Sequence, residues 1–371
     1  MEGNNTSIAK KALEPFARII KRNELTALQS VLLRFFAFIL AIIAGGIFIR
    51  LMGENPLEAY RLILKGSFLG SVRNPLSSIQ ATIVIAIPLL IVSLGLSFAF
   101  KMKFWNIGGE GQLIIGAIFS SYFALFHSNL PHLLLIILMF LAGALGGGLW
   151  GLIPAFFKVR FGTNETLFTL MLNYIALYII NYLESGPWQG TKGFASIAQF
   201  SENARLSIIG GVHIGWIFAL LLIVAVYFYL NHTKNGYEIS VVGESQATAH
   251  YAGMNVKRII LRTMFISGAI CGIAGMIQVS GIDYTLSTGV SGGVGFTGIT
   301  VAWLSQLNPF MIAGITAVFS ILEKGSGVMQ SELGLSSAMT DVLQGIILFF
   351  FLGCEFFIRY SVVFRKWRSD K

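Results

Sequence analysis

Residues 79–100 read IQATIVIAIPLLIVSLGLSFAF, a long run without a single charged side chain. A helix needs about 20 consecutive apolar residues to cross the hydrocarbon core of a bilayer, so this run predicts one membrane-spanning helix. Further long apolar runs lie near residues 31–52, 108–127, 133–156, 165–183, 212–230, 263–281 and 341–358. The pattern therefore predicts an all-α polytopic membrane protein.

The composition of the whole chain agrees with this fold class. Of 371 residues, 55% are hydrophobic and 12% are charged, whereas soluble domains carry about 25% charged residues. So few charges cannot cover a water-facing surface, which excludes a soluble globular enzyme and a disordered chain. The net charge of +9 reflects basic residues that collect on the cytoplasmic side of membrane proteins, and we expect no nucleic-acid partner.

One further apolar stretch, residues 296–322, is interrupted by Asn308-Pro309. Proline removes a backbone donor and pushes the preceding residue out of the helical region, so we expect two short segments, 296–307 and 309–322. The chain then has about ten segments, with 19 Lys and Arg residues inside and 7 outside. This distribution places both termini in the cytoplasm. The two short segments must be broken or re-entrant helices.

This topology divides the chain into three parts. Residues 1–30 form a cytoplasmic amphipathic arm, expected to be a helix on the inner leaflet because apolar and basic residues alternate along it. Residues 31–358 form the transmembrane domain, with a long cytoplasmic loop at 232–262, and residues 359–371 form a basic cytoplasmic tail. Within the loop, residues 244–251 predict a short helix, and Gly253 is placed to end it in a left-handed cap. A docking surface and a plain solvated connector are both compatible with this loop.

Two glycine-rich interruptions separate the apolar runs. Residues 104–112 read FWNIGGEGQ, and a second tract between 281 and 298 ends in GGVGFTG. Glycine permits non-helical backbone and close approach of other groups. Paired breaks in the two halves of a chain point to the substrate path of a transporter. Tight loops at the membrane surface are the alternative interpretation.

The sequence lacks the motifs of several reaction classes. No glycine is followed by lysine, so there is no phosphate-binding loop for ATP, and the five histidines form no H-E-x-x-H metal pair. Cys271 and Cys354 lie in apolar runs and form neither a disulfide framework nor a zinc cluster. We expect a chain that is not an enzyme and binds no cofactor or metal. Its energy would come from a partner or an ion gradient.

Four motifs resemble those of a known family. WNIGGEGQ at 105–112 is similar to the F-N-I-G-x-E-G-Q signature of permease subunits in ABC importers for nucleosides and simple sugars, within the branched-chain amino acid and ribose-type binding-protein-dependent permeases. Three more stretches match in order: TNE with MLNYIA at 163–176, GYE with VGE and YAGMNVKR at 236–258, and GFTGI with VA and NP at 295–309. The chain departs from the family pattern at Trp105, Thr166, Trp303 and Ser305.

The resemblance implies a subunit of a larger importer in a bacterial cell membrane. This chain would pair with a homologous second permease, surrounded by membrane lipid. A cytoplasmic ABC ATPase, which carries ATP and Mg, would dock on the loop at 232–262, and an extracellular substrate-binding lipoprotein would deliver the nucleoside. The same architecture importing a simple sugar such as ribose or galactose is the alternative, and a gradient-driven secondary transporter is a third possibility.

The glycine breaks and the resemblance together mark the candidate residues. In the substrate pathway, aromatic rings would stack on a base and polar groups would bind ribose hydroxyls; the set is Phe104, Trp105, Asn106, Glu110, Gln112, Asn164, Glu165, Asn173, Phe296 and Thr297. Packing and helix–helix hydrogen bonding are the alternative roles. The resemblance assigns coupling to the ATPase to Glu238, Gly243, Glu244, Ala247, His250, Tyr251 and Gly253.

Overall fold

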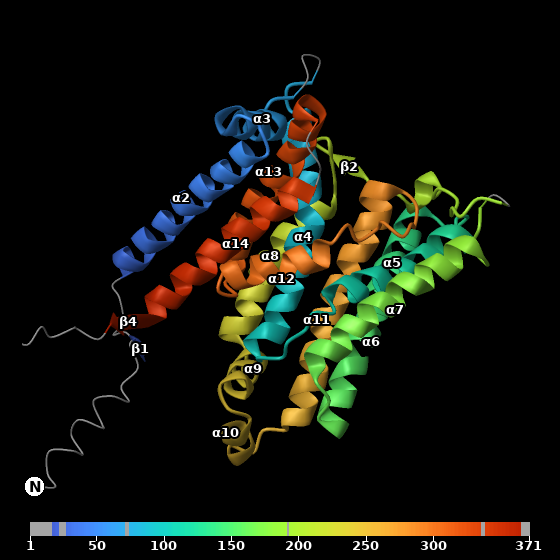
Figure 1. The fold of residues 1–371 in the computed structure, drawn as a ribbon. Helices are drawn as coiled ribbons and strands as arrows, with labels where there is room; N and C mark the ends of the chain where they lie inside the picture. The colour runs from blue at the N-terminus through green and yellow to red at the C-terminus, as the bar shows by residue number, and fades with distance from the viewer. Residues whose placement is uncertain (1–16, 22–26, 71–73, 191–192, 335–337, 365–371) are drawn as a thin grey trace, which may run out of the picture. The chain divides into compact units, whose positions relative to one another are not determined.

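The computed structural model describes residues 17–21, 27–70, 74–190, 193–334 and 338–364, and most of them are helical (Figure 1). The helices are α2 (Ala27–Leu51), α3 (Pro56–Phe68), α4 (Ser77–Lys101), α5 (Gly109–Phe126), α6 (His132–Phe161), α7 (Glu165–Ser185), α8 (Gly215–His232), α9 (Lys234–Glu244), α10 (Gln246–Tyr251), α11 (Val256–Gln278), α12 (Val294–Leu304), α13 (Pro309–Leu333) and α14 (Ala338–Arg359). The strands are short: β1 (Ala17–Lys21), β2 (Ile208–Ile209), β3 (Val212–His213) and β4 (Tyr360–Phe364).

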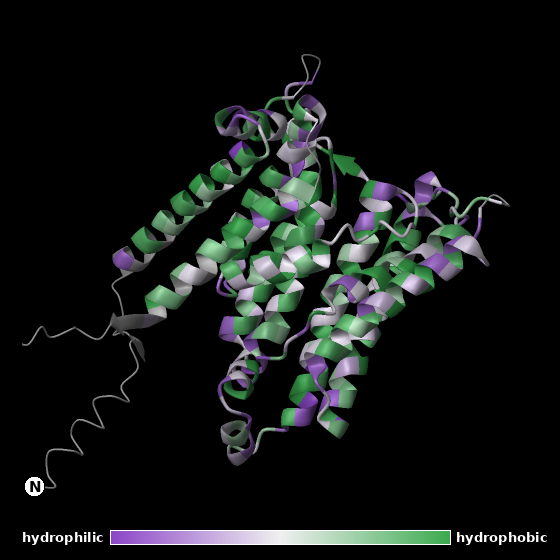
Figure 2. Cartoon of the chain, viewed as in Figure 1, coloured by the Kyte–Doolittle hydropathy of each residue, from purple (hydrophilic) through white to green (hydrophobic). Residues whose placement is uncertain are grey.

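The apolar helices confirm an all-α polytopic membrane protein. Within the described ranges, seven helices are long and apolar enough to cross a membrane, and an eighth crossing results if α2 and α3 form one bent span. Two shorter apolar helices, α12 and residues Asp341–Phe350 of α14, bring the apolar segments to ten. Hydrophobic residues cover most of the length of these helices, as Figure 2 shows.

Residues 296–322 differ in part from the prediction. Asn308-Pro309 does separate two helices, because the Asn308 side chain accepts from the amides of Phe310 and Met311 and so caps α13. However, α13 continues for 25 residues to Leu333. The expected short segment at 309–322 is therefore wrong: the charged residues that follow it end the apolar run but not the helix. Of the two segments, only α12, with 11 residues, is too short to cross a membrane alone.

Glycines bring α6 and α11 into direct backbone contact. Gly143 and Gly147 on α6 face Gly268 and Gly272 on α11. A Cβ at Gly147 would overlap the carbonyl oxygen of Gly268, and one at Gly272 would overlap that of Gly143. Small residues at four-residue spacing are the usual means of close helix packing in membranes. Helices α4 and α5 pack against the same α11, which is thus central to its unit.

The chain divides into two compact units, Tyr60–Leu335 and the combination of Met1–Ala59 with Ser336–Lys371. In the smaller unit, α2 packs along α14, and β1 pairs antiparallel with β4, with Ala17 opposite Phe364. The predicted amphipathic helix of the arm is wrong for residues 17–21, which are extended because a partner strand distant in sequence is available. The remainder of the predicted arm before α2, and the tail after Phe364, lie outside the described residues.

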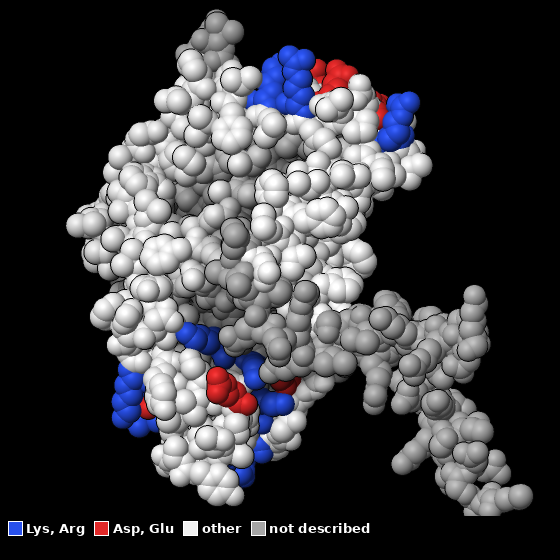
Figure 3. All heavy atoms as spheres, turned by 90° about the vertical axis from the view of Figure 1, so that its left-hand side faces the viewer, with Lys and Arg blue, Asp and Glu red and all other residues white. Residues whose placement is uncertain are grey.

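Charged side chains are distributed as a membrane requires. Among the described residues on the face drawn in Figure 3, Lys, Arg, Asp and Glu gather in two separate groups, and the residues drawn in white between them are uncharged. An ionisable group facing lipid costs about 3 kcal/mol or more at the centre of the bilayer. The uncharged region is therefore suited to contact with lipid.

Candidate substrate pathway and coupling surface

The first glycine-rich break connects α4 to α5. After α4 ends, Lys103 turns the chain with a positive φ of 57°. The buried Asn106 donates from its amide to Oε1 of Gln112 (3.2 Å), and Gln112 donates back to Oδ1 of Asn106 (3.3 Å). The same Oδ1 accepts from the backbone N–H of Gly108 (3.0 Å). This amide pair fixes the break against the first turn of α5.

Helix α7 holds the break from another side. The buried Asn173 accepts from the N–H of Gly111 (2.9 Å) and donates to the carbonyl of Ile107 (2.9 Å). The hydroxyl of Thr169 accepts from the N–H of Ile107 (3.2 Å). These side chains satisfy backbone groups that the irregular break leaves without helical partners. Thr169 was not predicted, although its place one turn before Asn173 on the same helix is a usable signal.

The second break follows α11. The helix passes into a π-helical turn, η2 (Val279–Asp283), and the chain then turns repeatedly until α12 begins. Tyr284, Gly292 and Gly293 have φ values of 54°, 52° and 78°. π-Helical turns and left-handed residues are local departures that are frequent at functional sites. Both predicted glycine breaks are thus real interruptions of helix.

Glu110 joins the two breaks. Its side chain is 7% exposed, and its carboxylate accepts from the N–H of Gly293 (3.2 Å) and the N–H of Gly295 (2.7 Å) at the start of α12. The first amides of a helix have no partners within the helix, and a carboxylate there also meets the positive end of the helix dipole. The structure therefore brings Asn106, Glu110, Gln112 and Asn173 together in one connected region.

Several aromatic rings lie near the contact between Glu110 and the start of α12. Trp105 is 49% exposed and stacks on Trp303 of α12, with ring centroids 5.1 Å apart and an angle of 18° between the planes. Phe296 is 44% exposed, Thr297 is half-buried and Phe104 is buried. Trp303 is absent from the predicted pathway set, although it departs from the family motif as Trp105 does. The two departures form one stacked pair.

Asn164 and Glu165 are engaged elsewhere. Asn164 caps α7 by accepting from the N–H of Leu167 (3.1 Å). Glu165 forms an ion pair with Lys158 at the end of α6, with 2.7 Å between Oε2 and Nζ. Among the described residues, no side-chain hydrogen bond links either of them to the glycine break. The oppositely charged Lys158, seven positions earlier, is the partner that the sequence analysis missed.

Helices α9 and α10 lie in the loop that the sequence predicts to be cytoplasmic, and we call residues 234–255 the elbow. Helix α10 begins at Gln246 rather than at residue 244, because the Ser245 hydroxyl accepts from the N–H of Thr248 (3.1 Å) and caps it. Gly253 follows it with a φ of 73°, as predicted. Glu244, Ala247, His250 and Gly253 are exposed, and Tyr251 is 92% exposed. Figure 1 shows α10 at one extremity of its unit.

Two of the predicted coupling residues, Glu238 and Gly243, contact other helices of this chain. Glu238 accepts from Nη2 of Arg262 (2.9 Å), which ties α9 to α11. Gly243 is buried against the end of α4, where a Cβ would overlap the carbonyl oxygen of Lys101. Both residues hold the elbow on the transmembrane helices.

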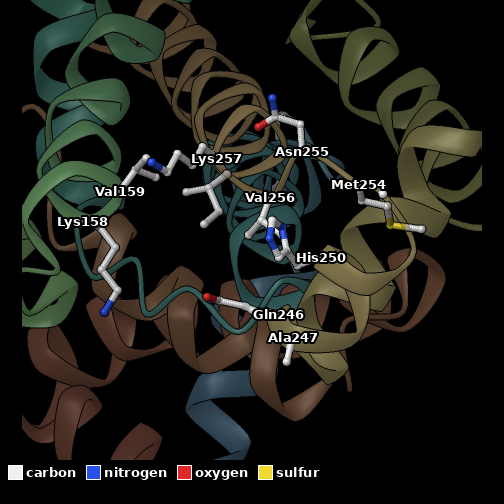
Figure 4. A pocket seen from close by; sticks show the side chains of 11 residues that line it. Lys158, Val159, Gln246, Ala247, His250, Met254, Asn255, Val256 and Lys257 are labelled. Carbon is white, nitrogen blue, oxygen red and sulfur yellow. The ribbon is translucent and has the colours of Figure 1, made fainter.

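A groove of about 640 Å³ lies beside α10. It is lined by the end of α6, by α10 and by the start of α11, and Figure 4 shows the side chains of Lys158, Gln246, His250 and Lys257 around it. An exposed helix next to a groove offers both a protruding and a receiving surface to a partner protein.

Residues 78–352 match the family described as the branched-chain amino acid transport system / permease component. The chain belongs to this permease family. It is 31% identical to the guanosine ABC transporter permease protein of Bacillus subtilis, with 87% of this chain and 93% of the relative aligned. It is 30% identical to a nucleoside ABC transporter permease protein of Lactococcus lactis (87% and 90%) and 29% identical to a glucose ABC transporter permease protein of Haloferax volcanii (87% and 87%).

The family membership confirms the resemblance drawn from the four motifs. The chain is an ABC transporter permease and a multi-pass protein of the bacterial cell membrane, and the aligned relatives are named as nucleoside and sugar permeases. Such permeases are not ATPases, and they work in a complex with other permease and ATPase subunits. Over the part of the chain that the structure describes, no three His, Cys, Asp or Glu side chains cluster as metal ligands would.

Proposed function

We propose that this chain forms, with a homologous second permease, the membrane pathway for nucleoside uptake. The observation that carries this proposal is the similarity to two nucleoside permeases, at 31% and 30% identity over 87% of the chain. ATP and Mg bind to a separate ATPase, and an extracellular lipoprotein delivers the substrate.

The arrangement of side chains supports different roles for the aromatic and the polar residues of the pathway. The polar groups of Asn106, Glu110 and Asn173 are occupied by partners within the chain. Trp105 and Phe296 instead present exposed rings near the same junction. A nucleobase stacks on such rings for about 1–3 kcal/mol. We therefore assign substrate contact to these rings, with Thr297 beside Phe296, and the shaping of the path to the buried polar residues.

We place the docking site of the ATPase on α10. Its exposed residues include Ala247, His250 and Tyr251, with Glu244 and Gly253 at either side. Motion of the ATPase would reach the spans through the contacts of Glu238 and Gly243 with α11 and α4.

Uptake in cells tests the nucleoside assignment. Accumulation of radiolabelled guanosine, adenosine and uridine is compared between a strain with this chain and the same strain after its deletion, with glucose as the matched control. We expect nucleoside uptake to be lost on deletion and glucose uptake to be unchanged. Undiminished nucleoside uptake would contradict the assignment.

Sugar import is the second candidate, because the glucose permease protein of Haloferax volcanii is 29% identical over 87% of its length. Loss of glucose, ribose or galactose uptake, with nucleoside uptake intact, would favour it. A gradient-driven transporter would instead show solute movement by the purified chain alone in liposomes without ATP.

A further inference from the structure

Helix α12 is bounded at both ends by left-handed backbone. Gly292 and Gly293 precede it, with φ values of 52° and 78°, and Gln306 and Leu307 follow it, with φ values of 50° and 60°. Left-handed backbone costs a residue with a side chain about 1–2 kcal/mol, so two in succession mark an enforced break. Helix α12 is thus an 11-residue helix separated from α11 and α13 by a turn at each end, and it packs against α4 and α5.

Glu110 binds the first turn of this helix. Its carboxylate accepts from the two glycine amides, and the Ser291 hydroxyl and the N–H of Phe296 lie beside it and favour its charged form. The N–H of Phe296 also bonds to the carbonyl of Gly293 (3.0 Å). The carboxylate therefore forms a many-point connection between the start of α5 and the start of α12.

The contact between the two helices leaves no room for adjustment at Gly295. A Cβ there would overlap the backbone nitrogen of Glu110 and would lie 2.5 Å from its Cα. Backbone atoms cannot turn aside as a flexible side chain can. The start of α12 therefore lies directly on the first turn of α5.

The same part of α5 is connected to the elbow. Gly243, at the end of α9, lies on the carbonyl of Lys101, and the ammonium of Lys101 donates to the carbonyl of Leu230 (3.2 Å) and to Oδ1 of Asn231 (3.3 Å). The short break that follows Lys101 is held to α5 by Asn106 and Gln112. These contacts form a continuous path from α9 to the residues that carry Glu110.

We propose that the hydrogen bonds of Glu110 to the start of α12, which we call the latch, make α12 move together with the start of α5. Motion received at the elbow would then reposition α12 in the pathway. Glu110 is in this sense a positioning residue. The inference rests on the proposed importer function, because it requires an ATPase to move the elbow.

The test uses the complete complex of both permeases and the ATPase in liposomes with the binding lipoprotein, supplied with radiolabelled guanosine. Glu110→Gln keeps the size of the side chain but replaces an acceptor oxygen by a donor that faces the α12 amides. We expect uptake to fall about 10-fold or more, while ATP hydrolysis stays within about 2-fold of the wild type. Ser291→Ala, which removes one donor and keeps the carboxylate, should lower uptake about 3-fold. Glu184→Gln on α7 is the matched control and should change neither rate.

A distance measurement separates the latch from a general structural role. Spin labels at Phe119→Cys on α5 and Thr300→Cys on α12 report whether the two helices move together, and the native Cys271 and Cys354 are buried away from the label. With Glu110 present, we expect the same distance distribution with and without ATP. In the Glu110→Gln variant, the distribution of distances between the two labels should broaden. Normal uptake by Glu110→Gln, or a label distance that changes with ATP in the wild type, would overturn the latch. A wild-type complex that takes up no nucleoside would overturn the proposed function instead, and the label distances would still decide the latch.

Discussion

The break between α4 and α5 and the elbow of α9 and α10 are both glycine-containing connections with many polar side chains, but they use them in opposite ways. In the break, Asn106, Glu110 and Gln112 are buried and bonded to neighbouring segments. In the elbow, His250 and Tyr251 are exposed. Polar groups that are buried and satisfied determine shape, whereas exposed ones are available to a partner. Substitutions in the break should therefore affect stability, and those on the outer face of the elbow should affect assembly.

The largest effect is expected at Gly295. In Gly295→Ala the new methyl group overlaps the backbone of Glu110, and no side-chain rotation relieves the overlap. We expect a loss of about 3 kcal/mol in the free energy of unfolding, measured by thermal unfolding of the detergent-purified protein. Gly327→Ala in α13 is the matched control, because nothing lies within 4 Å of its Cβ position. The control should be neutral or stabilised by up to about 1 kcal/mol. Equal melting temperatures for the two variants would contradict the close contact of α5 and α12.

Asn173→Leu removes the amide that joins α7 to the break. The N–H of Gly111 and the carbonyl of Ile107 would then be buried without partners, at a cost of about 1–3 kcal/mol for each group. We expect a loss of about 2–3 kcal/mol in the same unfolding measurement. Asn181→Leu, on the exposed face of the same helix, loses only a bond to the carbonyl of Leu177 and should change stability by less than about 0.5 kcal/mol. A larger effect at Asn181 than at Asn173 would show that the break does not depend on α7.

His213 is a buried titratable side chain, and it should make the stability of the protein depend on pH. It lies in β3, just before α8, it is 2% exposed, and neither ring nitrogen has a hydrogen-bond partner. Burial lowers the pKa of His213 to about 4, from an ordinary value of about 6.5. Between these values the unfolded chain binds more protons than the folded one. The contribution of neutral His213 to the free energy of unfolding is therefore fully present above pH 6.5 and is lost as the pH falls toward 4.

We expect this histidine to cost about 2 kcal/mol of stability between pH 7.5 and pH 5. The measurement compares melting temperatures at the two pH values for the wild type, His213→Leu and the exposed-residue control His250→Ala. The leucine variant should show a smaller pH dependence, whatever its stability at neutral pH, and the control should behave like the wild type. Identical pH dependence in all three proteins would show that His213 is not buried in its neutral form.

The sequence predicts the helices well and the contacts of the break poorly, for one physical reason. Hydropathy is a local property, so the runs at 79–100 and 165–183 correspond closely to α4 and α7, whereas α11 begins seven residues before the run at 263–281 because its first turns are polar. Whether Glu110 faces a substrate or an amide of α12 depends on a segment 185 positions away. The extent of α13 and the pairing of β1 with β4 likewise depend on tertiary contacts. By contrast, the cap at Gly253 is encoded in a few adjacent residues and is correctly predicted.

The smallest effect on stability is expected on the outer face of α10. Tyr251→Ala combined with Glu244→Lys alters exposed side chains, so the free energy of unfolding should change by less than about 0.5 kcal/mol. If α10 receives the ATPase, the amount of ATPase that copurifies with the variant should fall severalfold, because side chains at the centre of an interface carry most of its binding energy. Ala249→Leu, at the buried position of the same helix, should instead destabilise the chain by about 1–3 kcal/mol. Full retention of the ATPase by the double variant would show that the partner is held elsewhere, since α10 would then be exposed without being used.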